Sequence, residues 1–190
     1  AAAQSRVGIA VADAPVAIEQ STTYKNAVTQ IQTAYAPQIQ QMNARNQALV
    51  AEINALATAY NTAVAAKPQV PATVNAAAQA FQAKQQQAER EMATLRRPID
   101  LAMAYVQSQL TPRLEEATKN VMRVKKVDLI LSSQATTYAE PYVDISADIG
   151  AELSRLVPTV SVTPPAGWQP GQQQQPAAAP AKPAAKPKTR

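Results

Sequence analysis

Apolar and polar residues alternate with a helical period along most of this chain. Apolar side chains recur three and four positions apart, which is the heptad pattern that keeps one face of a helix against a partner helix. In the first run these positions are Ile39, Met42, Leu49, Ile53, Leu56 and Tyr60, with a polar Asn46 at one of them. In the second run they are Phe81, Met92, Leu95, Ile99 and Val106. The pattern predicts two antiparallel helices that share one apolar seam.

The two runs are separated by the sequence Lys67-Pro68-Gln69-Val70-Pro71, in which two prolines interrupt any helix. We therefore expect a helical hairpin over residues 21–126 with its tip near residues 67–71. Each arm has at least about 45 residues and would reach roughly 65 Å at about 1.5 Å per residue. Ser21 is expected to cap the outgoing helix through its hydroxyl group.

Three prolines lie within the predicted arms, and each should mark a kink or a restart, because an internal proline costs a helix about 3 kcal/mol or more. These prolines are Pro37, Pro98 and Pro112. Thr111-Pro112, followed by Glu115 and Glu116, has the composition of a helix start.

The two ends of the hairpin are flanked by short apolar runs. Residues 7–12 predict a strand, and residues 16–20 predict one helical turn. Residues 127–132 predict a second strand, with residues 135–138 returning as a third. Asp144 is expected to cap a short helix with one apolar face. The expected fold is mainly α (α+β), with a small β/α body formed by residues 1–20 and 127–157 and a hairpin inserted between them.

Residues 158–190 are rich in proline, glutamine and alanine. We expect them to be disordered, because they cannot bury enough apolar surface to offset the entropy of ordering. The net charge of +5 belongs mainly to this tail, which holds Lys182, Lys186, Lys188 and Arg190. The remaining 14 basic residues nearly balance the 13 acidic ones.

The chain has no cysteine and no histidine, which excludes thiol and imidazole catalysis, disulfides and nearly every zinc site. Only 4% of its residues are aromatic, and much of its 46% apolar content is alanine, which suits an elongated helical protein. The close carboxylate pairs, Glu115 with Glu116 and Asp144 with Asp148, fit helix capping and surface charge better than catalysis. The sequence therefore predicts no catalytic site, no metal site and no cofactor.

Several of these segments resemble the Skp/OmpH family of periplasmic chaperones for outer-membrane proteins. The resemblance runs from about Val7 to Leu156. It is carried by residues 9–13 with Ile18, Ser21 and Tyr24, by residues 78–81, by residues 127–131 with Tyr138, and by residues 143–149.

The resemblance implies a homotrimer whose strands form a central β-body, with three hairpins enclosing a cavity for unfolded outer-membrane proteins. Its implied function is that of an ATP-independent holdase, without enzymatic activity, in the periplasm of a Gram-negative bacterium. The start at Ala1-Ala2-Ala3-Gln4 fits a removed signal peptide, although an artificial chain start would look the same. The residues expected in the trimer body are Ile9, Val11, Leu129, Ile130, Leu131, Tyr138, Ile145 and Ile149.

Residues beside the apolar seam are the candidates for client binding, since seam residues are expected to face the opposite arm. These candidates are Val50, Val64, Leu101, Met103, Tyr105, Arg96 and Arg97. The returning arm is rich in basic residues, which form either a solvated helix face or a surface that attracts acidic clients or an anionic lipid surface.

Two other functions remain open on the sequence alone. A structural or adaptor protein would dock a folded partner through the tip at residues 67–71. A nucleic-acid binder would use the basic tail, but four cations offer few phosphate contacts and no aromatic residues alternate with them, so no nucleic acid is expected as a partner.

Overall fold

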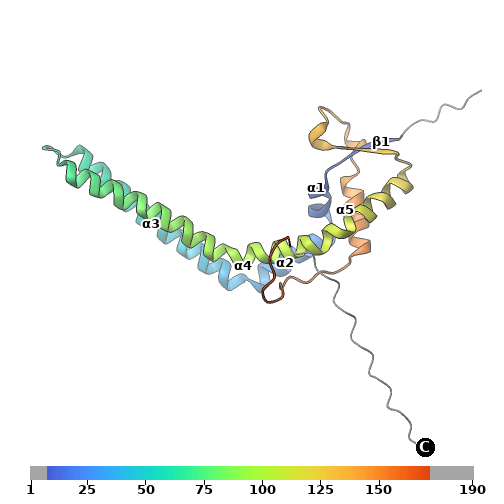
Figure 1. Cartoon of the computed structure of the whole chain (residues 1–190), viewed down its shortest axis with the longest axis horizontal. Coiled ribbons are helices and arrows are strands. Elements are labelled where there is room, and N and C mark those ends of the chain that lie inside the picture. Colours follow the sequence, from blue (N-terminus) through green and yellow to red (C-terminus); the bar gives the residue numbers. More distant parts are fainter. Residues whose placement is uncertain (1–7, 172–190) are drawn as a thin grey trace, which may run out of the picture.

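The computed structural model describes residues 8–171, which form a small body and one long arm (Figure 1). The chain is mostly helical, which confirms the predicted fold class. Its regular elements are β1 (Ile9–Ala12), α1 (Ala14–Gln20), α2 (Thr22–Ala34), α3 (Ala36–Ala65), α4 (Pro71–Lys125), β2 (Leu129–Ser132), η1 (Ser133–Ala135), η2 (Pro141–Val143) and α5 (Ser146–Leu156).

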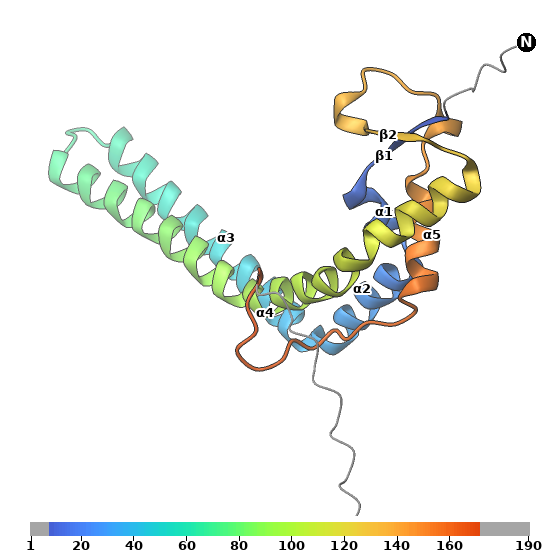
Figure 2. The same cartoon turned by 45° about the vertical axis from the view of Figure 1, so that its right-hand side comes forward.

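The body is organised by a two-stranded parallel sheet formed from the two ends of the described chain. Ile9 pairs with Leu129 and Val11 with Leu131, so the whole helical hairpin lies between the two paired strands in sequence. An isolated bridge joins Val11 to Asp144 on the other side of β1. Helices α1 and α5 and the last part of α4 gather around this sheet (Figure 2).

The core of the body is made by residues of β1, α1, α2, the later part of α4 and α5. Its buried members include Ala10, Ile18, Ile31, Val106, Leu110, Val121, Ile149 and Leu153. Residues of β1, α1 and α2 therefore pack with residues of α4 and α5 that lie about a hundred positions later. Ser21 begins α2 as predicted, because its hydroxyl oxygen accepts a hydrogen bond from the backbone N–H of Tyr24 at 3.2 Å.

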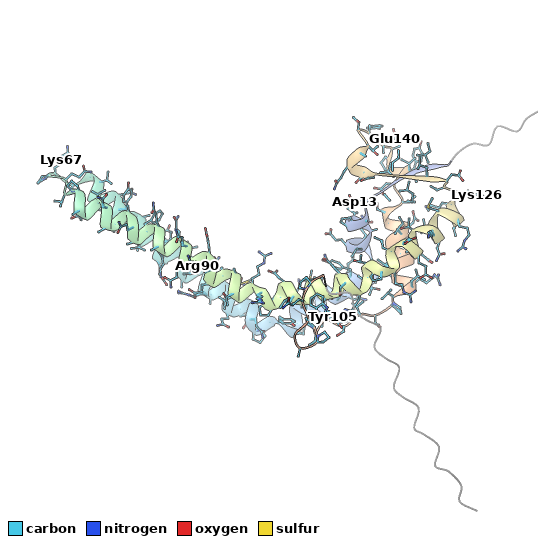
Figure 3. The ribbon with its side chains drawn as sticks, in the orientation of Figure 1. Asp13, Lys67, Arg90, Tyr105, Lys126 and Glu140 are labelled. Atoms are coloured by element: carbon cyan, nitrogen blue, oxygen red, sulfur yellow. The ribbon has the colours of Figure 1, made fainter. Side chains whose placement is uncertain are left out.

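The arm consists of α3 and the first part of α4, which run side by side and antiparallel (Figures 1 and 2). The predicted helical hairpin is confirmed in outline, and its tip lies between Ala65 and Pro71. Figure 3 shows Lys67 at the far end of the arm and Glu140 in the body.

The prolines behave differently from one another. Pro37 lies in the first turn of α3, directly after the break at Tyr35, so the predicted restart there is confirmed. The predicted restart at Pro112 is wrong, because α4 continues through both Pro98 and Pro112 and only bends between arm and body (Figure 2). Both prolines are exposed, so the carbonyl groups left without a helical partner lie near solvent.

The predicted third strand at residues 135–138 is also wrong. After β2 the chain closes a short 3-10 turn, in which the Thr136 hydroxyl donates to the Ser132 carbonyl at 2.9 Å. This turn leads the chain away from the sheet, and Tyr138 is 76% exposed.

Residues 158–171, which we call the strap, are ordered, although we expected them to be disordered. Val160 and Val162 pack against the core of the body, and the strap crosses the lower side of α2 and α4 in Figure 2. The prediction of disorder from Pro158 onward is therefore wrong for the strap. The rest of the tail, residues 172–190, lies outside the described residues, as does Val7 at the start of the expected first strand.

Candidate binding surfaces

One face of the body sheet is apolar and open to solvent. Ile9, Leu129 and Leu131 point to the same face, because they occupy paired or alternate positions of the parallel ladder. Their side chains are 52%, 47% and 40% exposed, respectively. The opposite face, which carries Ala10 and Ile130, packs against the core.

A parallel sheet normally has both faces covered, because the crossover connections place other elements on each side. In the described chain this face is covered at Val11, which is 6% exposed, but not at Ile9, Leu129 and Leu131. Strand β2 is paired with β1 on one side only. Exposed Val124, Tyr138 and Tyr142 add to the apolar surface of the body. Exposed apolar side chains gathered on one face, as at Ile9, Leu129 and Leu131, are typical of a protein–protein contact.

The residues predicted for the arm seam are all partly or fully buried. Leu49 is fully buried, at 2% exposure, and Val106 lies in the core of the body. The partly buried members are Ile39, Met42, Ile53, Leu56, Tyr60, Phe81, Met92, Leu95 and Ile99. Asn46, at a heptad position, is exposed.

A charged cluster ties α3 to α4 near the middle of the arm. Arg45 donates to Glu52 at 2.8 Å and to Glu91 at 3.1 Å, and Lys84 forms an ion pair with Glu52. The hydrogen bond from Lys84, followed by that from Arg45, lowers the pKa of Glu52. The hydrogen bond from Arg45 likewise lowers the pKa of Glu91. Both glutamates are therefore charged at neutral pH, and the cluster links α3 to α4.

The candidate client-binding residues fall into three places. Val50 and Val64 lie along α3 and are 50% and 43% exposed. Arg96 and Arg97 are exposed on α4, and Arg96 pairs with Asp100 at 3.1 Å. Leu101 and Met103, at the base of the arm, are half-buried, and Met103 packs against the core.

Tyr105 is not open to solvent, although we expected it beside the seam as part of a client-facing surface. It is only 9% exposed, and its ring meets that of Trp168 edge to face, with 5.2 Å between ring centroids and 70° between ring planes. Figure 3 shows Tyr105 at the bend of α4, where the strap crosses it. The strap covers this side chain, and the sequence pattern of α4 alone could not reveal that.

Two hydrogen bonds between the strap and α4 were not predicted from the sequence. The Gln109 side-chain amide donates to the Ser161 carbonyl at 2.8 Å and accepts from the Ser161 N–H at 2.9 Å. The available signals were the alternation of Val160 and Val162 and the single tryptophan of the chain in an otherwise polar tail. Neither signal identifies a partner on α4.

Two acidic residues of the body have structural partners that lower their pKa. Asp13 accepts from the Val16 N–H at 3.1 Å and from the Ser133 hydroxyl at 2.8 Å, and these two bonds lower its pKa. Hydrogen bonds from Arg155 and then Asn120 lower the pKa of Glu152 to about 2. Among residues 8–171 no cluster of three potential metal-binding side chains occurs.

The close carboxylate pairs, for which we expected capping and surface charge, also have partners. Asp144 accepts from the Ser146 N–H at 2.8 Å at the start of α5, and Asp148 pairs with Lys125 at 2.7 Å. Glu115 and Glu116 pair with Lys119 and Arg113, respectively, within α4. None of the helices in the described chain has the length and apolar character required to cross a membrane.

Fold and surfaces together define an elongated helical-hairpin protein whose small α+β body and arm both present apolar surface. The chain belongs to the OmpH-like family of outer membrane proteins, whose sequence model matches residues 8–153. The family predicted from the residues is therefore confirmed.

A solved structure from Caulobacter crescentus, proposed to be an outer membrane chaperone (OmpH-like), is similar to this chain. The two are 19% identical with a TM-score of 0.47, over 84% of this chain and 90% of that chain. A search of curated proteins finds no match.

Proposed function

We propose that this protein is an ATP-independent holdase that binds unfolded outer-membrane proteins in the periplasm and acts as a homotrimer. Membership of the OmpH-like family supports a chaperone role in general terms. The observation that carries the proposal is the arm, which projects from the body with much of its apolar surface exposed.

The arm has the surface that a holdase needs. Within α3, every residue of which is described, Leu49 alone is buried, so the helix presents alanine and scattered apolar side chains to solvent. Val50 and Val64 are such side chains. Many weak and dispersed contacts hold an unfolded chain by multivalency, while each contact is released quickly.

The open face of the body sheet supports self-association. Ile9, Leu129 and Leu131 would be covered if further copies of the chain brought their own sheets to this face. In a closed cyclic assembly the arms would project from one central body, leaving a sheltered space between them. This arrangement would enclose a client without a built pocket or a catalytic group.

The test is dilution of a urea-unfolded outer-membrane β-barrel protein into buffer, with light scattering as the measure of aggregation. We expect suppression of scattering at an equimolar amount of trimer. Absence of suppression at severalfold excess would count decisively against the holdase.

A matched pair of variants tests the oligomer. Leu129→Lys places a charge on the open sheet face, and we expect sedimentation to show dissociation and light scattering to show weaker suppression. Val50→Lys places the same charge at an equally exposed site on the arm and should leave the oligomer intact. If both variants or neither dissociate the oligomer, the sheet face is not the interface.

The alternative is an adaptor that docks a folded partner through the arm tip. Val64 and Val70 are exposed near the tip, and exposed apolar side chains there favour the adaptor function. Exchanging residues 67–71 for Gly/Ser should abolish an adaptor function, whereas a holdase should keep most of its activity.

A further inference from the structure

The strap lies along a regular stripe of α4. Arg97, Leu101, Tyr105 and Gln109 are four positions apart and therefore share one face of the helix. Ser161 of the strap meets Gln109, and Trp168 meets Tyr105. Gly167, Trp168 and the residues after them line a hollow of about 560 Å³ together with Arg97 and Leu101. The strap thus meets the stripe at successive points, in an order antiparallel to α4.

Gln109 contacts only the backbone of the strap. Its side-chain amide uses its donor for the carbonyl and its acceptor for the N–H of the same residue, Ser161. The amide nitrogen also donates to the Tyr105 carbonyl at 3.1 Å, which holds the amide in place. Every residue except proline offers the same two backbone groups. Gln109 therefore recognises the backbone of one residue, whatever side chain that residue carries.

Tyr105 adds a preference for an aromatic side chain. The edge-to-face contact with Trp168 is the favoured geometry for two aromatic rings, and such pairs add attraction beyond the buried area. The strap between the two contacts is not helical, because Pro164 and Pro165 interrupt any helix and the Trp168 N–H closes a turn onto the Pro165 carbonyl at 3.0 Å. The site therefore accepts a bent, non-helical chain. Free backbone groups and one aromatic anchor are also what a segment of an unfolded β-barrel protein presents.

The strap is not an optimal permanent occupant. The Trp168 Nε1–H is buried, and it has no hydrogen-bond acceptor within residues 8–171. A buried donor without a partner weakens the contact that buries it. Client aromatic residues such as phenylalanine carry no such donor and would avoid this cost.

We propose that this stripe is a binding site for one unfolded, aromatic-containing segment of a client, and that the strap occupies the site in cis until a client displaces it. The proposal rests on the holdase function and adds a defined site and the chemistry that the site recognises. It also explains why Tyr105 is covered in the single chain.

The first experiment uses Trp168 as its own reporter, because it is the only tryptophan of the chain. The probe is a tryptophan-free peptide of about ten residues, the length of one barrel strand, with alternating Val and Thr around one Phe. Added to the full chain, it should shift Trp168 emission to the red in a saturable way. Saturating probe binding with unchanged emission would overturn the proposal.

The second experiment measures binding of the same peptide, labelled with fluorescein, by fluorescence anisotropy. It distinguishes effects on the strap from effects on the binding site. Trp168→Ala weakens the strap alone and should tighten probe binding on the order of tenfold. Trp168→Phe keeps an aromatic ring without the unpaired donor, so the strap should hold at least as well and the probe should bind no more tightly than to the parent chain. Adding Gln109→Ala in the Trp168→Ala background should weaken binding about fivefold, because two backbone hydrogen bonds are lost. Gln85→Ala, at an exposed glutamine of the same helix, is the matched control and should change nothing.

The double variant is necessary, because Gln109→Ala in the parent chain weakens strap and probe together and the two effects cancel. Equal probe affinity for the parent and Trp168→Ala chains would show that the strap does not compete, and this inference would then fail. If the chain still prevents aggregation in that case, the holdase function stands without it. If the chain binds neither probe nor unfolded β-barrel protein, both proposals fail.

Discussion

Leu49→Ala should loosen the arm while leaving the body folded. Leu49 is 2% exposed and is the single buried residue of α3, and it lies outside the core cluster of the body. Replacing a buried leucine by alanine costs about 2–5 kcal/mol. We expect about 3 kcal/mol here, which raises the opening equilibrium of the arm roughly a hundredfold.

The assay is amide hydrogen exchange followed by mass spectrometry, which resolves the arm from the body. Exchange should accelerate in α3 and the facing part of α4, while α5 and the strands keep their protection. Val50→Ala is the matched control, since its side chain is half exposed and its removal should cost under about 0.5 kcal/mol. If Leu49→Ala accelerates exchange equally in arm and body, the two form one cooperative unit and the reasoning is refuted.

Three further predictions concern the body and the pH response. A Cβ added at Gly150 would lie 2.5 Å from the Ala17 carbonyl oxygen, so Gly150→Ala should force α5 away from α1 and cost about 1–3 kcal/mol in urea unfolding. Because the folded pKa of Glu152 is lowered to about 2 from an ordinary value of 4.5, its stabilising effect is complete above pH 4.5 and lost as pH falls through about 2. Glu152→Gln should therefore flatten the fall in unfolding free energy across that window, and an unchanged slope would contradict the assignment. With no histidine in the chain, client affinity should stay constant between about pH 5.5 and 8, and a clear titration there would count against purely apolar and backbone contacts.

Local periodicity was sufficient to predict the hairpin and its ends. The heptad spacing of residues such as Leu49 and Ile53, the prolines at residues 68 and 71, and the cap at Ser21 all act within one or two helical turns. Because these signals depend on neighbouring residues, they can be read without knowing where the rest of the chain lies.

The sequence by itself thus determined the two long helices, the place where the chain reverses, the flanking strands and the family. Only the tertiary structure decided that α4 continues through Pro112, that residues 135–138 leave the sheet, and that the strap covers Tyr105. The position of the strap depends on contacts between residues far apart in sequence, such as the pairing of Gln109 with Ser161, and such contacts leave no periodic trace in either segment. The strap has too few apolar residues to form a core of its own, so the sequence predicted disorder. It is ordered because it packs against a surface that another part of the chain provides.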